Sequence, residues 1–121
     1  MYFKRNEPLR YSFDEPVSGT LTKLNDHDTV TISVLLLDIS NQGAKIKCKN
    51  NIALSKETEI KLAYTLNSVH FHALGKVSWT KSYSNLIEIG LQLNTDESYQ
   101  KNMIAALKEI VKTKQKNAEN V

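Results

Sequence analysis

The stretch Leu35-Leu36-Leu37-Asp38-Ile39-Ser40-Asn41-Gln42-Gly43 decides how the rest of the chain is interpreted. An apolar strand runs into a polar turn here, and a second strand leaves it. Because side chains alternate along a strand, Asp38 and Ser40 point to the same side and place a carboxylate beside a hydroxyl. Gly43 has no Cβ, which leaves room for a ligand and permits positive φ. The pattern suits a planar ligand rich in hydrogen-bond donors, such as a purine, but it is also typical of an ordinary hairpin turn.

The strand before this turn is predicted over residues 29–37, with the apolar residues Val30 to Leu36 alternating on one face. If the alternation continued, Asp38 and Ser40 would point into the core. Both side chains are too polar to be buried without partners. We therefore expect that the strand bends after Leu37, or that these two side chains lie at an open rim.

Five further segments show the period-two alternation of strands. The full set of six predicted strands covers residues 16–24, 29–37, 44–49, 59–66, 69–79 and 87–93. Asn67-Ser68 fits a two-residue hairpin turn. The alternation also predicts that Trp79 shares an inward face with Phe71 and Val77.

Residues 96–116 change to a helical period, with apolar residues recurring at intervals of three and four. Thr95 or Asp96 can cap the N-terminus of this helix, and lysines close its C-terminus. The apolar stripe is expected to pack on the strands of the same domain. An exposed stripe that receives a partner helix is the alternative.

Six short antiparallel strands usually curl into a closed structure, which removes unpaired sheet edges. The fold class expected is therefore mainly β, a six-stranded antiparallel β-barrel with a C-terminal α-helix. We divide the chain into an N-terminal arginine-bearing arm (1–15), the barrel with its helix (16–113) and a polar tail (114–121).

The composition is that of a single ordinary globular domain of 121 residues, with 40% hydrophobic residues and a net charge of +3. No apolar run approaches the length that spans a membrane, and the N-terminus does not resemble a secretory signal. One cysteine, Cys48, excludes an internal disulfide and fits a cytoplasmic location.

Arginine is unevenly distributed. The chain has 16 basic residues, but its two arginines, Arg5 and Arg10, both lie within the first ten positions. Arginine differs from lysine because its planar fork donates in pairs to phosphate or to a guanine edge and stacks on flat rings. This placement indicates a specific task for the N-terminal segment, although a solvated chain end is the plainer interpretation.

Histidine and acidic residues do not predict a metal site. Asp26, His27 and Asp28 are adjacent and cannot easily face one ion, and His70 and His72 have no evident third ligand. No nucleophile–base pair or phosphate-loop spacing is present, so an enzyme is not expected.

Taken together, these segments resemble the PilZ domain family. Asp38-Ile39-Ser40-Asn41-Gln42-Gly43 matches the D/N-x-S-x-x-G motif of that family. Gly75-Lys76-Val77-Ser78-Trp79 is similar to its G-x-V-x-W strand, and Ile89-Gly90-Leu91-Gln92-Leu93 resembles its last strand. The resemblance covers roughly residues 4 to 112, and the order and spacing of the three segments are more specific than any one of them.

The resemblance implies a cytoplasmic receptor or adaptor for the bacterial second messenger cyclic di-GMP. By motif, Arg5 and Arg10 would clasp guanine and phosphate, and Asp38, Ser40 and Gly43 would hold the guanine edge. Binding would order the arm over the barrel and alter the interaction with a protein effector. The resemblance implies no cofactor apart from this ligand, no metal, no nucleic-acid polymer and no insertion into a membrane.

The arm departs from the family pattern, which is R-x-x-x-R. Four residues separate Arg5 from Arg10, and the family spacing counted back from Arg10 falls on the uncharged Asn6. A missing charge-assisted hydrogen bond would weaken binding about ten- to a hundredfold. This departure supports an alternative, a PilZ-like protein-interaction module that does not bind nucleotide. A small barrel that binds single-stranded RNA or DNA is a further alternative, although few aromatic residues are expected on its surface.

Overall fold

The computed structural model describes residues 10–24, 29–49 and 54–119, and its strands and helix follow in the order β1 to β6 and then α1. The element bounds are β1 (Arg10–Lys23), β2 (Val30–Ser40), β3 (Gly43–Lys49), β4 (Glu59–Leu66), β5 (Val69–Ser82), β6 (Leu86–Asn94) and α1 (Glu97–Glu119). The first strand begins at Arg10 rather than at Pro16, because Arg10 to Ser12 already pair with the end of β2.

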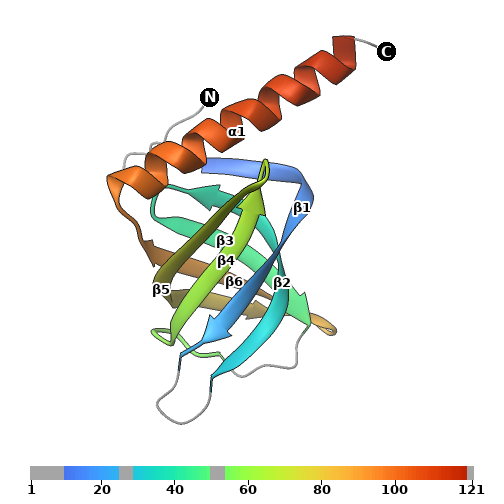
Figure 1. Cartoon of the computed structure of the whole chain (residues 1–121). Coiled ribbons are helices and arrows are strands. Elements are labelled where there is room, and N and C mark those ends of the chain that lie inside the picture. Colours follow the sequence, from blue (N-terminus) through green and yellow to red (C-terminus); the bar gives the residue numbers. More distant parts are fainter. Residues whose placement is uncertain (1–9, 25–28, 50–53, 120–121) are drawn as a thin grey trace.

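The strands form a closed barrel in the order β1-β2-β3-β6-β5-β4, and every pairing is antiparallel (Figure 1). Closure occurs between β4 and β1, which pair over Gly19–Lys23. A closed barrel leaves no long unpaired edge, which is the physical reason for this architecture in a short all-antiparallel chain. The expected six-stranded antiparallel β-barrel with a C-terminal helix is confirmed.

The core of the barrel is built from the inward rows that alternation predicts. Leucine and isoleucine side chains dominate it, and the fully buried ones include Leu21, Leu36, Ile46, Ile60, Leu62 and Ile89. Burying one such side chain stabilises a fold by roughly 1.5–3 kcal/mol. The β4–β5 hairpin turns at Asn67 and Ser68, which both have positive φ (49° and 65°), as a two-residue turn requires.

Three register irregularities interrupt the ladders of the described strands. They lie between Ser12 and Val17 in β1, between Leu36 and Asp38 in β2, and between Val77 and Trp79 in β5. An extra residue in one strand of a pair reverses which face its later side chains occupy. In Figure 1 the first part of β1 runs along the barrel end beneath α1 before the strand turns down the wall.

The prediction that Trp79 points into the core is wrong. The irregularity at Ser78 shifts the register, so that Val77 faces Leu91 but Trp79 faces Gly90. Val77 is fully buried, whereas Trp79 is 42% exposed on the outside of the barrel. Alternation also predicts Val69 in the inward row of Phe71, but Val69 is exposed because it follows the hairpin turn directly.

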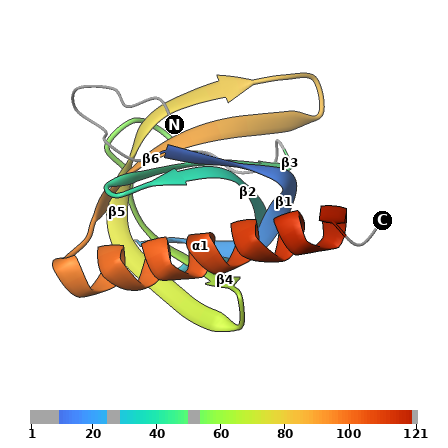
Figure 2. The same cartoon turned by 90° about the horizontal axis from the view of Figure 1, so that it is seen from above.

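Helix α1 lies across one end of the barrel, and its C-terminal part extends past the barrel wall (Figures 1 and 2). Asp96 caps it, since its Oδ1 accepts a hydrogen bond from the Tyr99 backbone N–H at 2.8 Å. Met103, Ala106 and Leu107 are buried against the barrel, so the predicted stripe packs on the strands of its own domain. No helix in the described part of the chain combines the length and apolarity needed to cross a membrane.

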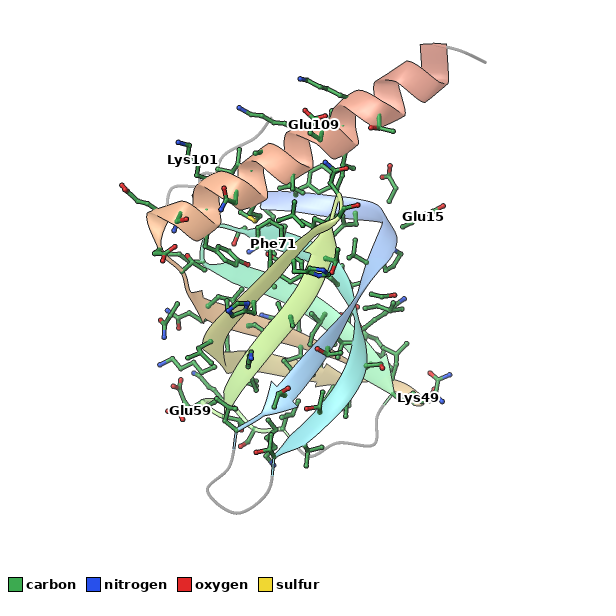
Figure 3. All side chains as sticks on the ribbon, in the orientation of Figure 1. Glu15, Lys49, Glu59, Phe71, Lys101 and Glu109 are labelled. Carbon is green, nitrogen blue, oxygen red and sulfur yellow. The ribbon has the colours of Figure 1, made fainter. Side chains whose placement is uncertain are left out.

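An aromatic cluster joins the helix to the barrel. The Phe71 ring stacks on Tyr64 with centroids 5.3 Å apart and meets Tyr99 edge-on at 5.7 Å. The Tyr64 and Tyr99 hydroxyls hydrogen-bond to each other. Figure 3 shows Phe71 below α1 at the barrel end, with Lys101 on the side of the helix away from the barrel. Burial is the main cause that raises the pKa of both tyrosines.

Candidate functional site

The irregularity in β2 determines where the carboxylate of Asp38 lies. Leu36 faces Ile46 of β3, but Asp38, two residues later, faces Lys45, so Leu37 is the extra residue. After this point Ile39 takes the core position and is fully buried, and Asp38 and Ser40 lie on the opposite face. Of the two expected arrangements, a bent strand or an open rim, this irregularity corresponds to the first, and it keeps the Asp38 carboxylate out of the apolar core.

Two cations flank the Asp38 carboxylate. Arg10 Nη1 donates a hydrogen bond to Asp38 Oδ1 at 2.7 Å, and Lys45 Nζ lies 3.8 Å from Asp38 Oδ2. The Asp38 side chain is only 8% exposed, whereas those of Arg10 and Lys45 are 42% and 37% exposed. A nearly buried carboxylate needs such partners, and both cations are partly exposed beside it.

Arg10 reaches Asp38 because β1 and β2 pair at this end of the barrel. The backbone of Arg10 lies opposite Ser40, and Ser12 lies opposite Asp38. The arginine is thus part of the barrel wall rather than of a separate segment. Arg5, the other predicted clamp residue, lies outside the described residues.

Ser40 and Gly43 occupy different positions relative to the surface. Ser40 is fully buried and its Oγ donates to the Gly43 carbonyl at 3.4 Å, so its hydroxyl lies behind the turn and does not line the cleft described below. Gly43 does line that cleft. No glycine in the described ranges has positive φ, so Gly43 is not needed here for a left-handed backbone.

The turn between β2 and β3 is fastened to the start of the helix. Thr95 Oγ1 donates to the Asn41 carbonyl at 2.7 Å, and the Leu93 N–H donates to the Gln42 carbonyl at 2.9 Å. Gln100 of α1 in turn donates from Nε2 to Thr95 Oγ1 at 2.9 Å. These contacts tie the backbone of the turn to β6 and to the first turn of α1.

A cleft of about 520 Å³ opens beside the Arg10–Asp38 pair. Its lining comes from β1, β2, the β2–β3 turn, β3, β5 and β6, and comprises Arg10, Asp38, Gln42, Gly43, Ala44, Lys45, Ser78, Trp79, Gly90, Leu91 and Gln92. Its lining is mostly polar, and the volume lies within the range of small-molecule sites. Of the five predicted site residues, the structure brings Arg10, Asp38 and Gly43 together here.

The Trp79 side chain covers Gly90 inside this cleft. A Cβ built on Gly90 would lie 2.1 Å from Trp79 Nε1 and 2.3 Å from Cε2, so only a glycine allows the indole this close. Register pairs Asp38 with Lys45, Lys45 with Gly90, and Gly90 with Trp79. A carboxylate, an ammonium and an indole therefore follow one another across four neighbouring strands.

Sequence reasoning did not assign Trp79 or Lys45 to the site. Unbroken alternation predicts Trp79 inside the barrel. In residues 44–49, lysines alternate with apolar residues, and this pattern alone predicts Lys45 on an outer, solvated strand face. A signal did exist: Trp79 and Gly90 fall in the two segments similar to the later strands of the PilZ family.

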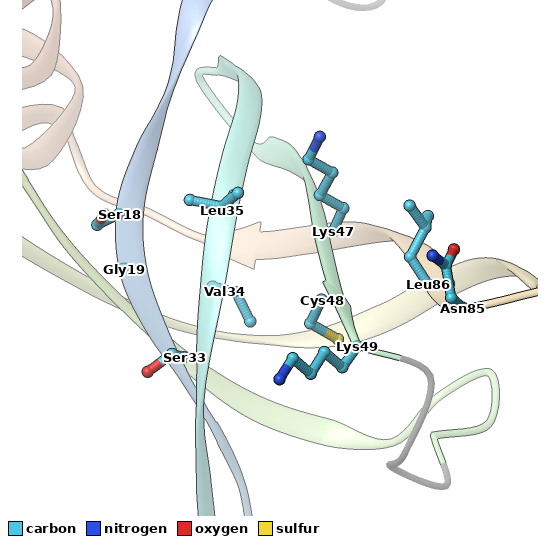
Figure 4. A pocket seen from close by; sticks show the side chains of 10 residues that line it. All are labelled: Ser18, Gly19, Ser33, Val34, Leu35, Lys47, Cys48, Lys49, Asn85 and Leu86. Carbon is cyan, nitrogen blue, oxygen red and sulfur yellow. The ribbon is translucent and has the colours of Figure 1, made fainter. Parts of the chain in front are cut away.

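A second groove of about 400 Å³ lies elsewhere on the barrel, between β2 and β3 where the two strands diverge (Figure 4). Val34 and Cys48 point toward the space between these strands, with Lys47 and Lys49 on β3 nearby. Its lining is mostly apolar, and burial raises the pKa of the Cys48 thiol. Its described lining contains lysines but no carboxylate, in contrast to the first cleft.

Histidines take no part in a metal cluster among the residues that the structure describes. His70 Nδ1 and Thr65 Oγ1 share a hydrogen bond of 2.8 Å on the outer face of the sheet. Asp26, His27 and Asp28 lie outside the described residues.

The described residues thus form a small closed β-barrel with a polar cleft beside an irregularity in β2. The family model for the PilZ domain matches residues 3–109, and the chain belongs to this family. No curated protein matches the chain by sequence.

Solved structures share the fold. YcgR of Escherichia coli in complex with c-di-GMP aligns with a TM-score of 0.69 at 15% identity, over 97% of this chain and 50% of that one. MrkH of K. pneumonia in complex with c-di-GMP aligns with a TM-score of 0.68 at 14% identity, over 96% of this chain and 57% of that one. PlzA of Borreliella burgdorferi in complex with c-di-GMP aligns with a TM-score of 0.57 at 11% identity, over 88% of this chain and 52% of that one. The chain thus spans about half the length of these proteins.

Proposed function

We propose that this domain binds cyclic di-GMP in the cleft beside Arg10 and Asp38 and acts as a receptor or adaptor without catalytic activity. The observation that carries the proposal is the Arg10–Asp38 pair of 2.7 Å at the edge of a cleft that also contains an exposed tryptophan. Membership of the PilZ family and the c-di-GMP complexes of structural neighbours support the choice of ligand.

The chemistry of the cleft is complementary to guanine and phosphate. A guanine presents two N–H donors on its Watson–Crick edge, and the acceptor oxygens of Asp38 fit that edge. Arg10 can donate in pairs to a phosphate or to guanine oxygen and nitrogen acceptors. The exposed face of Trp79 offers a surface on which a base can stack, which is worth about 1–3 kcal/mol per base.

In this proposal Arg5 and the segment that carries it close over the bound ligand. The ligand would then link the N-terminal segment to the barrel and change the surface offered to a protein effector, in the cytoplasm where the messenger acts. Ser40 would contribute indirectly, because its buried hydroxyl holds the Gly43 carbonyl and so fixes the turn below the ligand.

The position of Trp79 provides a direct assay. It is the single tryptophan of the chain and lies in the cleft, so its fluorescence reports on this site alone. Titration with cyclic di-GMP should give a saturable change in emission that Asp38→Ala weakens strongly. An unchanged emission at high micromolar ligand, with no heat in calorimetry, would reject the proposal.

The spacing of Arg5 and Arg10 favours a second candidate, an interaction module that does not bind nucleotide. A partner protein recovered equally well with and without cyclic di-GMP, together with a flat titration, would support it. The exposed side of α1 is then the first surface to mutate.

A further inference from the structure

Lys45 stands at the centre of the cleft. It lies on β3, with Asp38 of β2 on one side and Gly90 of β6 on the other. The Trp79 indole lies over Gly90. Neighbouring strands are about 4.8 Å apart, so the lysine stem starts one strand away from both the carboxylate and the ring platform. A ligand that contacts both Asp38 and Trp79 has to pass over Lys45.

The Lys45 ammonium is not engaged in a hydrogen bond with Asp38. Arg10 already makes the short hydrogen bond to this carboxylate, at 2.7 Å. Lys45 Nζ is 3.8 Å from Oδ2, which is beyond hydrogen-bond range, and its side chain is 37% exposed. Among the described residues the ammonium makes no closer ion pair, so its donors remain available to an anion.

The proposed ligand requires a second cation besides Arg10. Its described lining holds two cations, Arg10 and Lys45, against the single carboxylate of Asp38. The proposed ligand carries two phosphates, and the position four residues before Arg10 is the uncharged Asn6. A lysine acts as a mobile point charge that suits a phosphate oxygen.

We propose that Lys45 is the second ligand-binding cation of this site and contacts a phosphate of the ligand. This inference rests on the proposed function, since it names a further contact within the same cleft. It separates Lys45 from Lys47, which comes two residues later on the same face of the same strand. Lys47 pairs in register with Glu88 and lines the other groove.

Calorimetric titration with cyclic di-GMP tests the inference on wild-type protein and on Lys45→Gln, Lys45→Arg and the matched control Lys47→Gln. We expect Lys45→Gln to weaken binding about tenfold or more, Lys45→Arg to retain affinity within about threefold, and Lys47→Gln to match wild type. The loss in Lys45→Gln should be smaller at about 0.5 M than at about 0.05 M salt, because screening weakens a phosphate contact.

Three outcomes overturn the inference. Wild-type affinity in Lys45→Gln, while Arg10→Ala binds weakly, would remove Lys45 from the site and leave the proposed function standing. A loss that is equal at both salt concentrations and accompanied by a lower melting temperature than that of Lys47→Gln would assign Lys45 to holding Asp38 instead. Absence of binding by the wild-type protein would reject the proposed function itself, and the inference with it.

Discussion

Trp79 of β5 lies directly over the backbone of Gly90 on β6, with its Nε1 only 2.1 Å from the place where a Cβ would stand. The two residues face each other because of the irregularity at Ser78, which moves Trp79 from the core to the cleft. The ring position thus depends on a missing side chain in the neighbouring strand.

Gly90→Ala should displace the indole without unfolding the barrel. The new methyl group would collide with a side chain that is 42% exposed and can move outward, so we expect a stability loss of only about 1 kcal/mol. Affinity for cyclic di-GMP should fall about fivefold to a hundredfold, because the stacking surface is lost. Chemical denaturation followed by tryptophan fluorescence measures the stability, and calorimetric titration measures the affinity.

Gly75→Ala is the contrasting control for this experiment. Its Cβ would lie 2.1 Å from the Gln92 carbonyl oxygen, which belongs to the backbone and cannot move aside. We expect this variant to lose about 3 kcal/mol of stability in chemical denaturation. Equal destabilisation by the two alanines would contradict the assignment of Trp79 as a movable cleft residue.

Removing either partner of the Arg10–Asp38 pair should weaken ligand binding by about tenfold or more, since each offers a charge-assisted contact. Asp38→Asn retains the shape of the side chain but replaces one acceptor by a donor, and it should bind nearly as weakly as Asp38→Ala. Lys47→Gln again serves as the control. Binding by Asp38→Asn at wild-type strength would show that the carboxylate does not read the guanine edge.

Thr95→Val should loosen the turn of the D-x-S-x-x-G motif. The substitution preserves volume but leaves the Asn41 carbonyl without the hydrogen bond of 2.7 Å, at a cost of about 1–3 kcal/mol. Because that turn borders the cleft, affinity should fall together with stability. The matched control is Thr113→Val. The Thr113 hydroxyl makes an exposed hydrogen bond to the Glu109 carbonyl, and losing this bond should cost less than about 0.5 kcal/mol.

The hydrogen-bonded pair of Tyr64 and Tyr99 predicts a dependence of stability on alkaline pH. Burial raises the pKa of both hydroxyls above the ordinary value of 10.0. The protonated tyrosine pair therefore makes its full contribution to the free energy of unfolding below pH 10. This contribution is lost as the pH rises further, because the tyrosines of the unfolded chain ionise first. Chemical denaturation between about pH 8 and pH 11 should show a steeper loss for wild type than for the Tyr64→Phe, Tyr99→Phe double variant. Parallel curves for the two proteins would argue against this origin of the effect.

Alternation of apolar and polar residues was enough to predict the barrel. Rows such as Ile60, Leu62, Tyr64 and Leu66 are buried as expected, and the change to a helical period after Asn94 marks α1. These patterns are local, and each is repeated over several residues. The strand ends were less accurate, since the pairing of Arg10 to Ser12 depends on a distant part of β2.

The irregularities are what sequence reasoning could not locate. The polarity of Asp38 predicted that β2 bends or that Asp38 lies at an open rim, because a buried carboxylate would be costly, but nothing local marks Ser78 as an extra residue. That single position decides whether Trp79 fills the core or lines the cleft. The involvement of Lys45 likewise follows from register across β2, β3 and β6, which one sequence does not reveal.

Calorimetric titration of the wild-type protein with cyclic di-GMP, and in parallel with cyclic di-AMP, tests whether the cleft beside Arg10 and Asp38 recognises guanine. Adenine presents a different Watson–Crick edge, on which a ring nitrogen acceptor would face the Asp38 carboxylate. We expect saturable binding of the guanine dinucleotide and at least about tenfold weaker binding of the adenine one. No heat with either dinucleotide, or equal affinity for both, would contradict this expectation.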